Sequence, residues 1–171
     1  MRIDTRATTL ACTATLALLA NLPVAAQGVR TEHNISLAMA NEAVMAAVDS
    51  CLKSGYNVSA SVVDRAGQVK AIARGDGSGP HTPDTSRRKA YTALTTRTPT
   101  AVVAENWQKN PASQNLVYIT DVLAVGGGVP IKMGTETIGA IGVSGAPGGQ
   151  LDEACGQAGI DKLKDRLASG S

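Results

Sequence analysis

The chain's two histidines are its best candidates for binding a metal, because a neutral imidazole donates a nitrogen lone pair to a metal ion. His81 follows the polar, glycine-rich stretch 75–80 and directly precedes a predicted helix. Binding groups are concentrated on loops held by a rigid scaffold, so His81 ranks first. His33 lies near the start of the mature chain predicted below, where chains often fray, and ranks second. For each histidine the alternative is an exposed side chain without a ligand.

Basic residues follow in the helix after the first of these histidines. Arg87, Arg88 and Lys89 occupy its first turns, where backbone amides favour an anion. Successive helical residues turn by about 100°, so at most two of the three face one ligand, and a solvated face is the alternative. Arg74 and Asp76 complete the candidate ligand-binding set. They could instead pair with each other or with Lys89 in a structural network.

Helical periodicity supplies the elements that position these residues. Apolar residues recur every three or four positions in segments bounded by caps and breakers. Ser36 is the N-cap candidate of the first segment and Gly55 its stop, while Thr82-Pro83 combines an N-cap with a proline at the first helical position. The predicted helices span residues 36–54, 83 to about 96, 99 to about 107, and 152 to about 168.

Two hairpins are predicted from alternating apolar residues. Strands 57–64 and 68–74 flank a turn in which Asp64 caps its own bend, and strands 129–133 and 137–144 flank a second turn. The stretch 111–122 is predicted to be a loop with a short apolar segment. This order of elements predicts an α+β fold, a single antiparallel sheet carrying helices.

Composition argues against several classes of partner. The 171 residues include 16 Lys+Arg and 14 Asp+Glu, for a net charge of +2, and only three Tyr, one Trp and no Phe. Nucleic-acid binding relies on clustered positive charge and on aromatic platforms, and both are scarce here. The core must therefore be built from Ala, Val, Leu and Ile.

Residues 1–26 have the layout of a secretory signal peptide. Arg2 and Arg6 precede an uncharged run over 7–20, and small residues precede Gln27. The run of 14 residues is shorter than the roughly 20 that cross a bilayer as a helix. We therefore expect cleavage, no membrane insertion afterwards, and a periplasmic or secreted protein. Removing 26 of 171 residues leaves 145, a single domain over 27–171.

Cleavage would also reduce the number of cysteines from three to two. Cys12 leaves with the signal peptide, so the exported chain keeps Cys51 and Cys155 in a compartment where disulfides persist. We predict that they pair. Two separate buried thiols are the alternative, because sequence does not reveal whether the two Cα atoms come within bonding range.

Five ordered stretches carry a family resemblance. They are Val62-Val63-Asp64-Arg65-Ala66-Gly67, Arg74-Gly75-Asp76-Gly77, Arg87-Arg88-Lys89-Ala90-Tyr91-Thr92-Ala93, Gly126-Gly127-Gly128-Val129-Pro130-Ile131 and Ile138-Gly139-Ala140-Ile141-Gly142-Val143-Ser144-Gly145. Together they resemble the GlcG/HbpS-like family of small haem-associated proteins over nearly all of the mature chain. The resemblance implies a profilin-like fold with a five-stranded antiparallel sheet and helices on its faces, homo-oligomers, and haem or a related tetrapyrrole as ligand.

We favour a binding function over catalysis, because the resemblance implies a haem ligand and the chain has no recognisable catalytic motif. We expect an exported protein that sequesters or carries haem non-covalently, with His81, or less favourably His33, as iron ligand and Arg88 or Lys89 near the propionates. The alternative is a small-molecule pocket enzyme that uses the same polar residues, without iron, on an organic acid or cofactor-derived substrate. A third possibility is a subunit whose only role is assembly.

Overall fold

The computed structural model describes residue 28 and residues 30–169. The chain divides into two units, Met1–Glu32 and His33–Ser171, and all the helices and strands below belong to the second. The predicted signal peptide lies outside the described residues. Among the described helices, none is long and apolar enough to cross a membrane.

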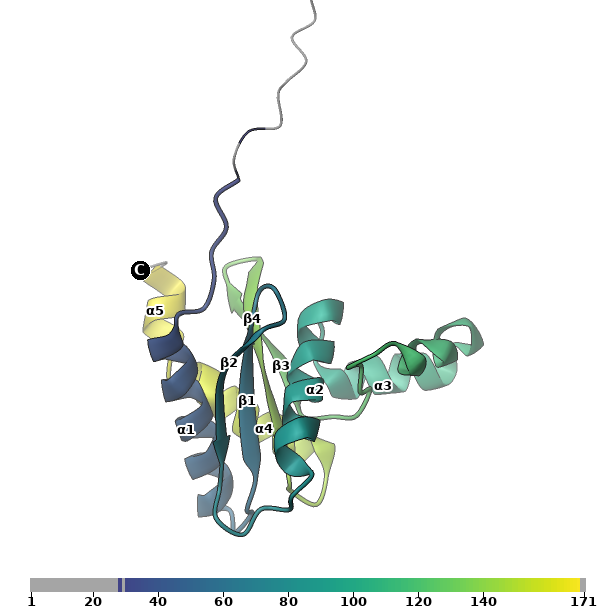
Figure 1. Ribbon diagram of the computed structural model, residues 1–171, viewed down its shortest axis with the longest axis horizontal. Coiled ribbons are helices and arrows are strands. Elements are labelled where there is room, and N and C mark those ends of the chain that lie inside the picture. Colours follow the sequence, from purple (N-terminus) through teal and green to yellow (C-terminus); the bar gives the residue numbers. More distant parts are fainter. Residues whose placement is uncertain (1–27, 29, 170–171) are drawn as a thin grey trace, which may run out of the picture. The chain divides into compact units, whose positions relative to one another are not determined.

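A four-stranded antiparallel sheet forms the centre of the second unit (Figure 1). Its strands are β1 (Ser59–Asp64), β2 (Val69–Arg74), β3 (Gly128–Met133) and β4 (Glu136–Ser144), arranged in the order β2-β1-β4-β3. Both predicted hairpins are confirmed, because β1 pairs with β2 and β3 pairs with β4. The α+β class is confirmed as well.

The expectation of a fifth strand is wrong for the part of the chain that the structure describes. Residues 111–122, which were predicted to be a loop, mostly form a 3-10 helix instead, η1 (Pro111–Tyr118). Asn110 starts it, since its side-chain oxygen accepts a hydrogen bond from the Ala112 amide at 3.1 Å. A proline in the first position and an asparagine cap favour helical turns over an extended strand.

The register of β1, one of the two central strands, defines two ends of the sheet. Ser59 pairs with Arg74 of β2 and with Ser144 of β4, whereas Asp64 pairs with Gly139. We call the first the loop end, because the loop after β2 begins there, and the second the hairpin end, because both hairpin turns lie there. At about 3.3 Å per residue, β1 separates the two ends by roughly 17 Å.

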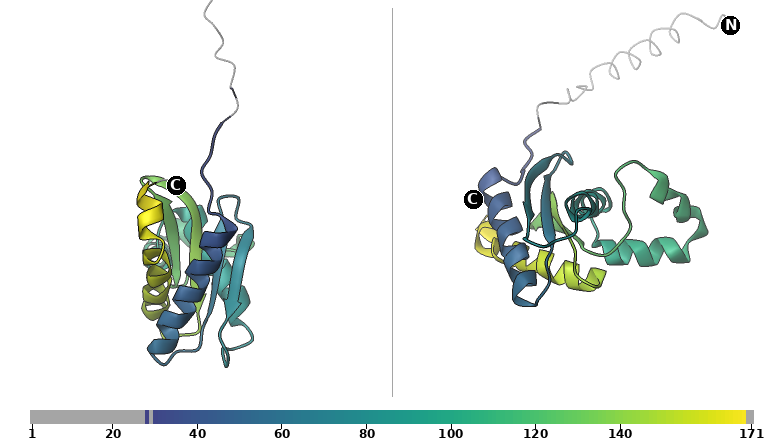
Figure 2. Two further views of the ribbon diagram at one scale, coloured as in Figure 1. Left: turned by 90° about the vertical axis from the view of Figure 1, so that its left-hand side faces the viewer. Right: turned by 60° about the horizontal axis from the view of Figure 1, so that its bottom comes forward.

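Helices cover both faces of the sheet (Figures 1 and 2). α1 (Leu37–Lys53) and α4 (Gly149–Asp161) pack against each other and against one face. α2 (Thr82–Thr96) packs against the other face, mainly on β4 and β1. α3 (Thr100–Lys109) and η1 pack on each other beyond α2, as Figure 2 shows.

The two faces of β1 differ in chemistry although all six of its residues are buried. Ala60 and Val62 join the larger hydrophobic core with α1 and α4. On the opposite face, the Ser61 hydroxyl bonds to that of Ser86 in α2 at 2.6 Å. Helix α2 also approaches the sheet closely, since a Cβ at Gly142 would lie 2.1 Å from the Ser86 carbonyl oxygen.

The caps of α1 agree with the prediction, but that of α2 does not. The Ser36 hydroxyl accepts a hydrogen bond from the Met39 amide at 3.2 Å, and Gly55 has a φ of +82°. Helix α2 already includes Thr82, so the predicted Thr82 cap is wrong. The Thr82 hydroxyl instead donates to the Gly79 carbonyl at 2.7 Å and accepts from the Ser59 hydroxyl at 2.7 Å.

The predicted C-terminal helix is interrupted. It consists of α4, which begins three residues earlier than expected at Gly149, and a short α5 (Lys164–Ser169). The chain tightens between them, since the Lys162 amide bonds to the carbonyls of both Ala158 and Ile160. The break allows Leu163 to be fully buried in the core.

Candidate functional site

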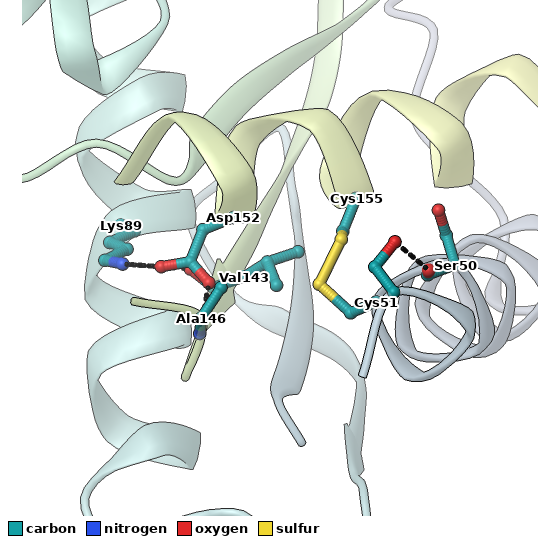
Figure 3. The surroundings of a disulfide bond; sticks show 8 residues. Ser50, Cys51, Lys89, Val143, Ala146, Asp152 and Cys155 are labelled. Carbon is teal, nitrogen blue, oxygen red and sulfur yellow. Dashed lines mark hydrogen bonds and ion pairs between the residues drawn. A yellow bond between two sulfur atoms is a disulfide. The ribbon is translucent and has the colours of Figure 1, made fainter. Parts of the chain in front are cut away.

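A buried ion pair joins α2 to α4 (Figure 3). The Lys89 ammonium lies 2.7 Å from the Asp152 carboxylate and donates to the Val143 carbonyl at 3.1 Å. The other carboxylate oxygen of Asp152 accepts from the Ala146 amide at 3.0 Å. Lys89 is 4% and Asp152 3% exposed, so the pair lies inside the protein. The sequence motif placed Lys89 among ligand-binding candidates, whereas its ammonium is already engaged internally.

Burial dominates the electrostatics of this pair. Desolvation raises the pKa of Asp152 above its ordinary value, while the Lys89 ammonium and the Ala146 amide act in the opposite direction. The network that the sequence suggested for Lys89 therefore exists, but its acidic partner is Asp152 rather than Asp76. Asp152 was missed because it lies 63 positions away in the chain.

The predicted disulfide is present beside this pair (Figure 3). Cys51 of α1 bonds to Cys155 of α4, with the two Cα atoms 5.5 Å apart. Both cysteines are buried in the main core. The bond therefore ties together the two helices that cover one face of the sheet.

Arg74 and Asp76 lie at the loop end and line one apolar cavity of about 250 Å³. We call it the α1–β2 groove; its other lining residues are Met45, Val48, Leu52, Tyr56, Asn57, Val58, Ala73 and Gly75. The Arg74 guanidinium donates to the Ser78 carbonyl at 2.7 Å, which holds it at the rim. The groove thus combines apolar walls with one cation and one carboxylate.

Hydrogen bonds fix the loop that leads from this groove to His81. The Ser59 hydroxyl lies 3.4 Å from that of Ser78 as well as bonding to Thr82. His81 itself is exposed, and its ring lies against Gly79, where an added Cβ would come within 2.8 Å of the ring. Within the described residues its ring nitrogens make no hydrogen bond. His81 therefore shares the loop end with Arg74 and keeps both nitrogens available.

The basic side chains of α2 point in different directions, as expected for successive residues of a helix. Arg87 bonds to Asp84 at 2.9 Å and to Asp121 at 2.7 Å, and Arg88 donates to the Val122 carbonyl at 2.9 Å. The hydrogen bond from Arg87 lowers the pKa of Asp121 below its ordinary value. Arg88 and Lys89 consequently face different surroundings, and neither lines the α1–β2 groove.

His33 lies at the opposite end of the sheet, beside the start of β4. Its Nδ1 is 2.8 Å from a Glu136 carboxylate oxygen, and the other oxygen of Glu136 pairs with Arg65. The hydrogen bond with His33 is the largest cause that lowers the pKa of Glu136. His33 also lines a second cavity, of about 320 Å³, together with Met39 and Met133. We call this the His33 cavity.

Sequence reasoning did not single out these methionines. Met39 falls on the predicted helix 36–54 and Met133 ends a predicted strand, so each fits a structural role. The sequence carries a weak signal for Met39, which lies six positions after His33, and none for Met133, which reaches His33 only in the fold. That proximity depends on the register of β3 and β4 and is not visible along the chain.

An antiparallel sheet covered on both faces by helices, with cavities at its two ends, defines a small α+β domain. Residues 35–161 match the family described as "Haem degrading protein HbpS-like". The chain therefore belongs to the HbpS-like family. It is also 30% identical over 117 residues to Protein GlcG of Escherichia coli, covering 67% of this chain and 84% of that protein.

Solved structures share the fold. A double Glu-to-Asp variant of HbpS from Streptomyces reticuli has 38% identity and a TM-score of 0.75, covering 84% of this chain and 98% of that one. The PduOC:haem complex has 22% identity and a TM-score of 0.67, covering 75% and 94%. At that lower identity the second similarity shows the fold alone.

Proposed function

We propose that this protein binds haem or a related tetrapyrrole non-covalently and sequesters or carries it outside the cytoplasm. Membership of a family described as haem-degrading carries the proposal. The haem complex of PduOC adds that this fold is compatible with a bound porphyrin.

The loop end provides groups of the kind that haem needs. The α1–β2 groove offers apolar surface for a porphyrin face, and Met45 and Leu52 at its wall are 53% and 59% exposed. Arg74 at the rim supplies a cation for a propionate. His81 follows on the adjoining loop with an unengaged imidazole, which suits an axial iron ligand. These features support His81 and Arg74 as the haem-binding residues.

Export is the second part of the proposal. The leader pattern of residues 1–26 suggests it, and the disulfide between Cys51 and Cys155 supports it because such bonds persist in oxidising compartments. The mass of the protein recovered from the periplasm or medium tests it. A protein that begins at Gln27 is expected, and an uncleaved chain would contradict export by this route.

Association between copies is the third part. Exposed apolar side chains cluster at the end of η1 and just after it, and Tyr118 there is 83% exposed. They are Leu116, Val117, Tyr118 and Ile119. Contiguous apolar surface of this kind marks interaction sites. It supports the homo-oligomer implied by the family resemblance, and light scattering tests it: a monomeric mass would refute it.

A haem titration of the full chain tests the central claim. Cys12 is replaced by serine in every sample, because its thiol could itself bind iron. The Cys12→Ser protein should develop a Soret band that saturates at stoichiometric haem. His81→Ala should shift the band and weaken binding about tenfold or more, and Arg74→Gln should also weaken it. His33→Ala and Lys109→Gln are the matched controls and should titrate normally.

Two outcomes would overturn this reading. The absence of any spectral change at micromolar haem would exclude haem binding and favour the enzyme without iron. Loss of the Soret band in His33→Ala but not in His81→Ala would identify His33, at the hairpin end, as the iron ligand instead of His81. Incubation of the complex with a reductant in air separates carriage from degradation, since a carrier retains its Soret band.

A further inference from the structure

The His33 cavity brings together one imidazole and two thioethers at the hairpin end of the sheet. His33 precedes α1, Met39 lies in its first turn, and Met133 ends β3. Met39 and Met133 are partly buried and pack against the main core, which restricts their motion. We propose that these three side chains form a binding site for a soft monovalent metal ion, Cu(I) or Ag(I), separate from the proposed haem site.

The hydrogen bond of His33 prepares its ring for a metal. An ionised carboxylate only accepts hydrogen bonds, so the contact of Nδ1 with Glu136 at 2.8 Å requires the ring proton on Nδ1. In the neutral ring the lone pair is then on Nε2, the nitrogen left for a ligand. Metal-binding histidines usually donate their second nitrogen to a carboxylate or carbonyl in this way. Arg65 pairs with the other oxygen of Glu136 and holds the carboxylate in place.

The ligand types select the metal. Thioether sulfur is a soft, uncharged ligand that favours Cu(I) over hard cations, and imidazole binds copper as well. Calcium and magnesium need several oxygen ligands, and zinc sites take histidine, cysteine and carboxylate. Within the described residues, no group of three or more His, Cys, Asp or Glu side chains could hold such an ion.

The charges around the cavity agree with a monovalent ion. Glu136 is shared between His33 and Arg65. Arg166, which also lines the cavity, pairs with Glu42. Both carboxylates are thus paired with basic groups, and no carboxylate is among the residues described as lining the cavity. This disfavours divalent ions, whose sites need anionic ligands.

The site is independent of the proposed haem site. Glu136 begins β4 at the hairpin end, whereas Arg74 pairs with Ser59 at the loop end. The length of β1, roughly 17 Å, separates these ends. Substitutions in the two sites should therefore have separate effects.

Methionine methyl NMR tests the proposal directly. The probe is Ag(I), which does not change oxidation state, added to the full chain with Cys12→Ser and ¹³C-methyl-labelled methionine. The methyl signals of Met39 and Met133 should shift and saturate together. That of Met45, which is 53% exposed on the same helix as Met39, should not move and serves as the internal control.

Affinity measurements with substituted proteins complete the test. The double variant Met39→Leu/Met133→Leu and the variant His33→Ala should each weaken binding of anaerobic Cu(I), measured against a chromophoric competitor, by tenfold or more. Met45→Leu and His81→Ala should leave it unchanged. Leucine nearly matches methionine in volume, and a urea denaturation curve for each variant confirms that the fold is retained.

The proposal is overturned if Met45 responds to Ag(I) as strongly as Met39 and Met133, or if the double variant binds Cu(I) as tightly as its parent. Neither result bears on haem, because the haem proposal is judged by His81→Ala and Arg74→Gln. A protein that binds haem but not Cu(I), or Cu(I) but not haem, therefore identifies which proposal has failed.

Discussion

Replacing Lys89 by methionine should destabilise the protein strongly. Methionine keeps much of the apolar stem but removes the ammonium that bonds to Asp152 and to the Val143 carbonyl. The carboxylate, 3% exposed, would then be buried without its cation and would keep only the Ala146 amide as a described hydrogen-bond partner. Breaking a buried pair in this way costs about 3–5 kcal/mol, out of a typical total stability of roughly 5–15 kcal/mol.

The pH dependence of this loss has a definite sign. Burial already raises the pKa of Asp152, and removing Lys89 takes away its main opposing influence, so the pKa rises further. Between the ordinary pKa of 3.8 and the raised native value, the native state holds a proton that the unfolded state has lost. Stability then increases as pH falls through that window, and the full penalty applies above it.

Urea denaturation measures both effects. The difference in unfolding free energy between Lys89→Met and the wild type should shrink as the pH is lowered from neutral towards 3.8, the ordinary pKa of the aspartate. Lys109→Met, at an exposed pair, is the control and should show almost no loss. In the double variant Lys89→Met/Asp152→Leu, which removes both charges, most of the stability should return. A loss below about 1 kcal/mol, or one independent of pH, would refute the reasoning.

Two further predictions concern stability. The double variant Cys51→Ala/Cys155→Ala should lose about 4–5 kcal/mol of unfolding free energy, because the disulfide closes a loop across 104 positions. An unchanged urea midpoint after reduction of the wild type would contradict this. Gly142→Ala should lose about 1–3 kcal/mol of unfolding free energy or more, since its Cβ would lie 2.1 Å from the Ser86 carbonyl oxygen and 2.5 Å from the Ala90 amide nitrogen of α2. Gly148→Ala, whose nearest neighbour is a flexible Gln150 side chain at 3.6 Å, should fold normally; equal losses at the two glycines would show that the close approach of α2 is not the cause.

Local patterns predicted most of the secondary structure. The 36–54 helix, its Ser36 cap and the two hairpins follow from periods of 3.6 and 2, and the Asp64 turn cap is present, since its carboxylate accepts from the amides of Ala66 and Gln68 at 2.9 Å. The failures occurred where local signals compete with packing. Thr82 looked like a cap but bonds to Ser59 of the sheet, and the last helix breaks so that Leu163 can enter the core.

The sequence by itself determined the class of fold, the family and the candidate histidines, basic residues and cysteines, but not Asp152, Met39 or Met133. These depend on composition, periodicity and ordered motifs, all of which are read along the chain. Only the tertiary structure decided how those residues are used. Lys89 forms a buried ion pair with Asp152. His33 and Met133 line the same cavity because of the strand register, which no local sequence pattern encodes. Side-chain partners are set by strand pairing and helix packing, which join positions that are 63 and 100 residues apart in these two cases. This is why chemistry visible in the sequence remained unassigned until the fold placed it.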